Sequence, residues 1–135
     1  MLLLTSTSDL VTLTTSAATN AVEIHTSYVD LNGATVTPGR TNTRVTTATT
    51  TTIIGAPAAS TTRNVKAIYV TNNSAGTNCT VAVSHTDGTT QVELMEFVLL
   101  PGENMGYRED GSWVHRDKVG AEYPPAGLGN YAGRS

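Results

Sequence analysis

The sequence predicts an all-β chain, an antiparallel β-sandwich of about eight short strands with jelly-roll-like or Greek-key connections and an extended C-terminal arm. Threonine supplies 25 of the 135 residues, all of them within the first 90, and its β-branched side chain favours a pleated sheet. Strong helix formers never recur with the 3.6-residue period of a helix. Turn-forming residue pairs recur about every 8 to 15 positions, a spacing typical of a sandwich.

The strands follow from runs of β-branched and apolar residues between these turns. We expect strands at residues 2–6, 10–16, 21–29, 44–54, 64–71, 78–86, 89–99, 103–109 and 112–116. Two intervening segments, 30–43 and 55–63, carry glycine and proline. We expect both to be irregular loops that are long enough to reach a neighbouring subunit.

Asp87-Gly88 is the strongest turn signal, because a two-residue type I′ turn needs positive φ at both central positions. A turn there sets Val83 opposite Val92 and Val81 opposite Leu94. The predicted inward face then holds Cys79, Val81, Val83, Val92 and Leu94, and the opposite face holds Thr80, Glu93, Met95 and Phe97.

Two further turns close the chain's last strands. Asp110-Gly111 repeats the hairpin signal and sets Tyr107 opposite Val114 and Arg108 opposite Trp113. Pro101-Gly102 is typical of a β-turn, since proline presets φ at the first central position and glycine tolerates positive φ at the second.

The chain divides into two parts by composition. Residues 1–118 hold all of the predicted strands, and we expect them to form one β-sandwich domain. Residues 119–135 hold four glycines, two prolines and two tyrosines without periodicity. We expect this segment to be an extended arm.

Composition and charge argue against several classes of protein. A formal charge of −3, with only 14% of residues charged, excludes nucleic-acid binding by bulk electrostatics. No apolar run reaches 18 residues, so we expect no membrane contact. The start of the chain has three leucines but no basic residues, so we expect no signal peptide. A single cysteine excludes an intrachain disulfide and a cysteine-rich metal site.

The sequence holds no catalytic or metal-binding motif. His25, His85 and His115 lie on distant elements without ligand spacing, although two of them can still converge across a sandwich. Cys79 is expected to face inward, where a thiol packs as a small apolar group. Glu93 and Glu96 are three residues apart, so we expect them on opposite faces of a strand. We therefore expect no enzyme activity, catalytic residue, metal or cofactor.

Interaction chemistry is what the sequence offers instead. Threonine-rich strands expose hydroxyls and methyls together, which suits contact with other proteins. Arg40 and Arg44 are the densest basic pair, and they fit either a salt-sensitive contact with an acidic neighbour or isolated surface charges. The opening leucines fit either a first core strand, which we favour, or an edge strand shared between subunits. The candidate partner-binding residues are Leu2, Leu3, Leu4, Pro38, Arg40, Arg44, Tyr123, Pro124, Pro125 and Tyr131.

Several segments resemble small β-sandwich structural proteins of tailed bacteriophages. They are Met-Leu-Leu-Leu-Thr-Ser-Thr-Ser-Asp, Thr-Pro-Gly-Arg-Thr-Asn-Thr, Ala-Pro-Ala-Ala-Ser-Thr-Thr-Arg-Asn-Val-Lys, His-Thr-Asp-Gly-Thr, Leu-Leu-Pro-Gly-Glu and Tyr-Arg-Glu-Asp-Gly-Ser-Trp. The resemblance spans roughly residues 1–117 and has no catalytic signature. In phages, such sandwiches serve as capsid cement (decoration) subunits, and related ones occur in head fibres, necks and tails.

The resemblance implies a non-enzymatic virion protein. We expect a homo-oligomeric capsid cement protein that is assembled in the host bacterial cytoplasm and lies on the capsid surface. Its expected partners are the major capsid protein and copies of itself, and it would bridge and stabilise capsomers. One alternative is a neck, tail or head-fibre protein. Another is a glycan-binding β-sandwich module, for which Trp113 beside Tyr107 is the candidate aromatic platform.

Overall fold

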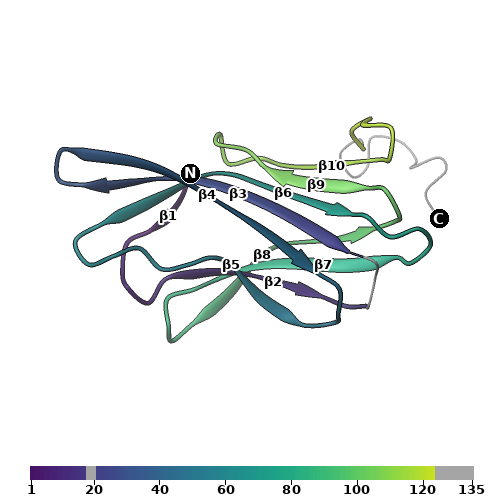
Figure 1. The fold of residues 1–135 in the computed structure, drawn as a ribbon, viewed down its shortest axis with the longest axis horizontal. Helices are drawn as coiled ribbons and strands as arrows, with labels where there is room; N and C mark the ends of the chain where they lie inside the picture. The colour runs from purple at the N-terminus through teal and green to yellow at the C-terminus, as the bar shows by residue number, and fades with distance from the viewer. Residues whose placement is uncertain (18–20, 124–135) are drawn as a thin grey trace.

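The computed structural model describes residues 1–17 and 21–123 and shows two antiparallel sheets packed face to face (Figure 1). Within those residues there are ten strands and no helix, so the predicted all-β sandwich is confirmed. The jelly-roll-like connectivity stays a prediction. The strands are β1 (Leu2–Leu4), β2 (Leu10–Thr15), β3 (Val22–Asn32), β4 (Thr35–Val45), β5 (Thr50–Ile54), β6 (Thr62–Asn72), β7 (Cys79–Thr86), β8 (Gln91–Leu99), β9 (Asn104–Tyr107) and β10 (Trp113–Arg116).

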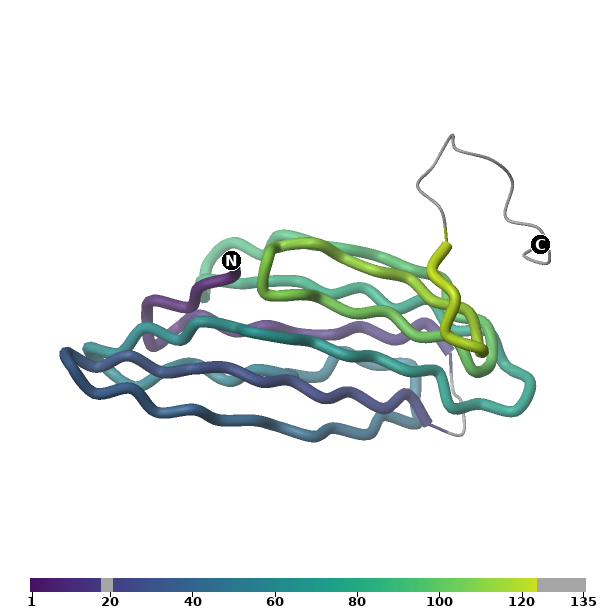
Figure 2. Tube along the Cα trace, turned by 90° about the horizontal axis from the view of Figure 1, so that it is seen from above, coloured from purple at the N-terminus to yellow at the C-terminus, as the bar shows by residue number. Residues whose placement is uncertain are grey.

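The larger sheet has the strand order β10-β9-β6-β3-β4, and the smaller sheet has the order β5-β2-β7-β8. β3 pairs with one edge of β6 along its whole length. The other edge of β6 is shared by two strands, because Leu2 of β1 pairs with Val65 and Tyr107 of β9 pairs with Ile68. Figure 2 shows the N-terminus beside the tip of the β9–β10 hairpin, which continues the line of β1.

The core lies between the sheets and consists of alternate residues from both. Its members are Leu4, Val11, Leu13, Val22, Ile24, Val45, Ile53, Ile54, Val65, Ile68, Val70, Cys79, Val81, Val83, Leu99, Met105 and Tyr107. Cys79 is fully buried, as predicted. Leu4 is also fully buried while Leu3 is 42% exposed, so the opening leucines form a core strand of this chain.

Residues 30–43 are not the irregular loop expected from the sequence. They are the outer half of a long β3–β4 hairpin whose turn is Gly33-Ala34, with Gly33 at φ +59°. The prediction was wrong because Pro38 was read as incompatible with a strand. Proline removes a ladder hydrogen bond in a central strand, but an edge strand tolerates it. β4 is such an edge. The predicted single strand 44–54 instead contains the end of β4 and the whole of β5.

The β7–β8 hairpin forms with a different register from the predicted one. Its loop has four residues, since Thr86 pairs with Gln91, and the Asp87 carboxylate accepts the N–H groups of Thr90 and Thr89 at 2.7 and 2.9 Å. These two hydrogen bonds lower the pKa of Asp87. A short-range turn signal alone does not distinguish this loop from a type I′ turn.

A bulge at Leu94 shifts the rest of this hairpin. Val83 pairs with Met95, and Val81 pairs with Phe97, so Met95 and Phe97 lie on the inward side, contrary to prediction. Val92 is 53% exposed. Glu93 and Glu96 pair with Ser84 and Ala82, two residues apart on β7, which places both glutamates on the outer face rather than on opposite faces.

The β9–β10 hairpin is one residue out of the predicted register. Tyr107 pairs with Trp113, because the Arg108 N–H donates to the Ser112 carbonyl at 2.9 Å and the turn between these two residues holds three residues, 109–111, instead of two. Gly111 donates to the carbonyl of Arg108 and has φ +89°, which is a type I turn followed by a left-handed glycine. The Pro101-Gly102 turn is present as predicted, with Gly102 at φ +84°.

The first residues of the predicted arm return to the domain. Glu122 forms a β-bridge with Arg116, and the Tyr123 N–H donates to the carbonyl of His115. The rest of the arm, residues 124–135, lies outside the described residues. Across the described ranges, no helix has the length and apolar character needed to cross a membrane.

Candidate binding surfaces

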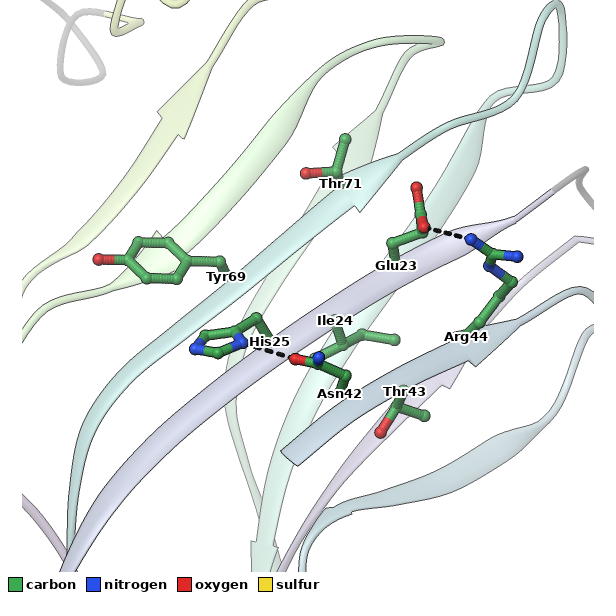
Figure 3. Close-up of a pocket in the computed structure, with 8 residues that line it drawn as sticks. All are labelled: Glu23, Ile24, His25, Asn42, Thr43, Arg44, Tyr69 and Thr71. Carbon is green, nitrogen blue, oxygen red and sulfur yellow. Dashed lines mark hydrogen bonds and ion pairs between the residues drawn. The ribbon is translucent and has the colours of Figure 1, made fainter. Parts of the chain in front are cut away.

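The outer face of the larger sheet carries a shallow hollow of about 510 Å³ (Figure 3). Alternation along the strands creates it. Ile24 and Val70 point into the core, so His25 and Tyr69 point outward. The lining residues are Glu23, Ile24, His25, Asn42, Thr43, Arg44, Tyr69 and Thr71, from β3, β4 and β6.

An exposed aromatic ring forms one wall of the hollow. Tyr69 is 51% exposed, and its ring stacks against His25 with centroids 6.3 Å apart and planes at 25°. His25 Nδ1 donates to Asn42 Oδ1 at 2.6 Å, which fixes the imidazole ring. Behind the phenol ring is Gly106, where a Cβ atom would lie 3.3 Å from Tyr69 Cδ1. Tyr69 is therefore supported on two sides and presents a ring face and a hydroxyl to solvent.

An ion pair forms the opposite wall. Arg44 Nη2 donates to Glu23 Oε2 at 2.8 Å, and Asn73 Nδ2 donates to Glu23 Oε1 at 2.8 Å. The hydrogen bond from Arg44 is the main reason that the pKa of Glu23 is lowered. The hollow is thus close to neutral, with polar groups around one aromatic ring. This arrangement suits a neutral ligand that has both hydroxyls and an apolar face.

The outer face of the smaller sheet is a second surface, on which β2, β5 and β7 present small uncharged side chains beside Glu93 and Glu96 of β8. Leu13, Val81 and Val83 point inward, so their neighbours in the strands point outward. We call the outward set the threonine surface. It consists of Thr12 and Thr14 on β2, Thr50 and Thr52 on β5, and Thr80, Ala82 and Ser84 on β7. The hydroxyls of Thr14 and Thr50 are hydrogen-bonded at 2.8 Å.

The three histidines occupy separate environments. His85 Nε2 lies 3.6 Å from Asp9 Oδ1, and His115 Nε2 donates to Glu103 Oε1 at 2.9 Å. His25 faces the hollow. In the part of the chain that the structure describes, no three His, Cys, Asp or Glu side chains gather as metal ligands. The convergence of two histidines that the sequence left open does not occur.

The candidate partner-binding residues do not form one site. Pro38, Arg40 and Arg44 lie on β4, at one end of the larger sheet. Tyr123 lies beside β10, at the other end, where its ring packs at a tilt against His115 and its hydroxyl donates to Glu103. Leu2, Leu3 and Leu4 form β1. Pro124, Pro125 and Tyr131 lie outside the described residues.

The aromatic platform predicted from Trp113 and Tyr107 is not exposed to solvent as a binding surface would be. The rings of Tyr107 and Trp113 are 5.1 Å apart, but Tyr107 is only 4% exposed and Trp113 packs partly buried against the core. Burial also raises the pKa of the Tyr107 hydroxyl. Sequence reasoning missed the Tyr69 hollow instead. The signal was present, because Tyr69 lies between Ile68 and Val70 and must point away from them.

Comparison with known proteins finds no relative. No protein-family model matches the chain, and no curated protein or solved structure is significantly similar to it.

Proposed function

We propose that this chain is a structural virion protein of a tailed phage, a capsid cement protein that binds the major capsid protein and copies of itself. Two observations support the proposal: the sequence resemblance and, above all, the threonine surface. That surface places seven small uncharged side chains on one face of the smaller sheet, and all of them except the buried Thr12 and Ser84 are at least partly exposed. The protein acts by binding, without catalysis or a cofactor, on the capsid surface.

The threonine surface suits broad contact between proteins. Burying charged groups at an interface carries a large desolvation cost, whereas methyl and hydroxyl groups lose little on burial when they find partners. Protein interfaces are correspondingly depleted of charge at their centres. A cement protein needs such a surface, because it adds buried area across the seams between shell subunits.

Charge placed on the threonine surface tests the proposal. Thr50→Lys and Thr52→Lys together put two charges on exposed β5 positions, and Thr89→Lys with Thr90→Lys puts the same charge on the exposed β7–β8 loop. We expect the first pair to lower occupancy on phage particles at least about tenfold, as a desolvation cost above 1.4 kcal/mol requires. The loop pair should bind normally. Equal occupancy for both contradicts the proposed surface.

Copy number separates cement from other virion roles. Quantitative mass spectrometry of purified particles should find hundreds of copies of a cement protein. A dozen copies or fewer would favour the neck, tail or head-fibre alternative.

The glycan-binding alternative is favoured by one observation, the exposed ring of Tyr69 beside His25 and Asn42. Sugars present apolar C–H faces that stack on such rings, and hydroxyls that bond amide and imidazole groups. Titration with maltohexaose, cellohexaose and chitohexaose should then shift the NMR signals of Tyr69 and His25, and Tyr69→Ala should abolish the shifts. Absence of shifts with all three argues against this function.

A further inference from the structure

The two sheets end in edge strands that carry opposite charge. β4 is the last strand of the larger sheet, and its charged residues are Arg40 and Arg44. β8 is the last strand of the smaller sheet, and its charged residues are Glu93 and Glu96. The edge of β4 is therefore purely basic along its own strand, and the edge of β8 is purely acidic. On β8 the stretch available to a partner is residues 91–97, because Val98 is already engaged in another interaction.

These charges are available to a partner. Arg40, Glu93 and Glu96 are exposed and form no ion pair with any residue in the described ranges. Arg44 contacts Glu23, but its side chain is 68% exposed. Arg40 and Arg44 pair with Ser27 and Glu23, alternate positions on β3, so both arginines lie on the outer face of the larger sheet.

The glutamates also lie on one face, because of the bulge at Leu94. Without the bulge, residues 93 and 96 would point to opposite sides of β8. With it, they pair with Ser84 and Ala82 and both face outward. Each edge strand therefore presents its two like charges on a single side.

An exposed edge strand offers unpaired backbone groups to any other strand, and charge decides which strand it accepts. Two β4 edges would bring arginines together, and two β8 edges would bring glutamates together. Of these three pairings of β4 and β8 edges, β4 against β8 is the one that brings opposite charges together. Pro38 lacks an N–H group, so the proline-free half of β4, from Arg40 to Val45, is the part that can pair fully.

The two edges cannot meet within one molecule. β4 packs beside β5 and β8 packs beside β9, on opposite sides of the sandwich. Figure 2 shows β4 (blue) along one border and the β9–β10 side, where β8 lies, along the other. A contact between them must join two copies, and each copy then still has one basic and one acidic edge strand for further contacts.

We propose that β8 of one copy adds to β4 of the next, with Glu93 and Glu96 against Arg40 and Arg44. The contact is heterologous, so repetition builds a ring if the rotation closes and a filament if it does not. The inference rests on the self-association included in the proposed function, and it names the surface responsible.

Charge reversal with mixing tests this contact. Variant one is Arg40→Glu with Arg44→Glu, which makes both edges acidic; variant two is Glu93→Lys with Glu96→Lys, which makes both basic. We expect light scattering after size exclusion to show oligomers of the unaltered chain that weaken with salt. Each variant alone should be monomeric, with self-association weakened at least tenfold. An equimolar mixture should assemble again, because acidic edges then meet basic ones.

A control variant carries the same charge change as variant one, away from both edges. Lys66→Glu with Lys118→Glu alters residues on β6 and after β10, and it should assemble like the unaltered chain. Circular dichroism confirms that each variant is folded. The proposal is overturned if either reversal leaves the oligomer intact, if the mixture stays monomeric, or if the unaltered chain is monomeric throughout.

The same variants separate this proposal from the proposed function. If the unaltered chain is monomeric yet occupies particles in hundreds of copies, the edge contact is wrong and the cement function stands. If the chain assembles through these edges but does not bind particles, the edge contact stands and the cement function is wrong.

Discussion

The phenol ring of Tyr28 on β3 covers Gly39 on the paired strand β4. A Cβ atom on Gly39 would lie 2.5 Å from Cε2 of that ring, well inside any normal contact. The guanidinium carbon of Arg63 lies 3.9 Å from the centroid of the same ring, so a second contact holds the ring in place. Gly39 is thus required by its neighbour rather than by its own backbone conformation.

Gly39→Ala should therefore destabilise the domain. We expect a loss of about 1–3 kcal/mol, as for other overpacked sites, measured by chemical or thermal unfolding. Gly76→Ala is the matched control, since a Cβ atom there would meet nothing within 4 Å. Equal melting temperatures for both variants would show that Tyr28 can rearrange freely.

Arg63 joins the two sheets at one end of the sandwich. It donates to both carboxylate oxygens of Asp30 at 2.8 Å and to the carbonyl of Gly55 at 2.8 Å, just after β5. Arg63→Lys removes the two-point hydrogen bonding and the stacking on Tyr28, which a compact ammonium cannot replace. We expect a loss of about 1–2 kcal/mol in the free energy of unfolding.

Lys66 provides the comparison for Arg63. Its only ion pair in the described residues is with Glu109, which is 70% exposed. Lys66→Met should change the free energy of unfolding by less than about 0.5 kcal/mol, because exposed ion pairs contribute little. A similar loss for both variants would contradict the role assigned to Arg63.

Asp9 should make stability depend on acid pH. Burial by itself raises the pKa of Asp9, but N–H groups of Thr5 and Ser6, at 2.6 and 3.1 Å, outweigh it and hold the pKa below its ordinary value of 3.8. A lowered pKa means that the charged carboxylate stabilises the fold. That contribution is complete above pH 3.8 and is lost as the pH falls through the lower, folded-state value.

Asp9→Asn should therefore be less stable than the unaltered chain at pH 7, by about 1–2 kcal/mol. The difference should shrink as the pH is lowered toward 3, because the carboxyl then becomes neutral too. Urea unfolding across this range measures it. If the Asp9→Asn difference is constant with pH, the stabilising charge is located elsewhere.

Two truncations separate the arm from the domain. Glu103 is 3% exposed and accepts hydrogen bonds from His115 Nε2, the Tyr123 hydroxyl and the Leu100 N–H. A chain ending at Lys118 loses the Tyr123 donor and should be less stable by about 1–2 kcal/mol. A chain ending at Tyr123 keeps this donor.

The chain ending at Tyr123 is consequently the proper test of the arm in particle binding. If the arm clamps the capsid, that truncation should reduce occupancy on particles at a temperature where circular dichroism shows the truncated chain to be folded. If the chain ending at Lys118 is as stable as the full chain, the contacts of Tyr123 contribute little to the domain.

Local residue chemistry predicts the strands well and their pairing poorly. The Asp110-Gly111 signal correctly locates a turn, but the third loop residue shifts Tyr107 from Val114 to Trp113. The bulge at Leu94 has no marker in the sequence, and it reverses the faces of Met95 and Phe97. Register depends on loop length and bulges, which tertiary packing decides.

The same holds for the candidate surfaces: the direction in which a side chain points is predictable from the sequence, but its neighbours on other strands are not. Alternation suffices to place Tyr69 outward, since Ile68 and Val70 flank it. It does not reveal that Asn42 on β4 accepts a hydrogen bond from His25. That contact depends on the β3–β4 hairpin, whereas a loop was predicted for residues 30–43. The single-faced glutamates of β8 depend in turn on the unmarked bulge.

The position of β6 has a consequence for how the chain folds. Its two edges pair with β1, β3 and β9, so Leu2 meets Val65 and Asn104 meets Thr71. Such distant pairings require large loops to close before the contacts can compensate for the lost entropy. We expect folding in milliseconds to seconds rather than microseconds. During synthesis, the half of the β6 edge that pairs with β9 stays unpaired until β9 has left the ribosome.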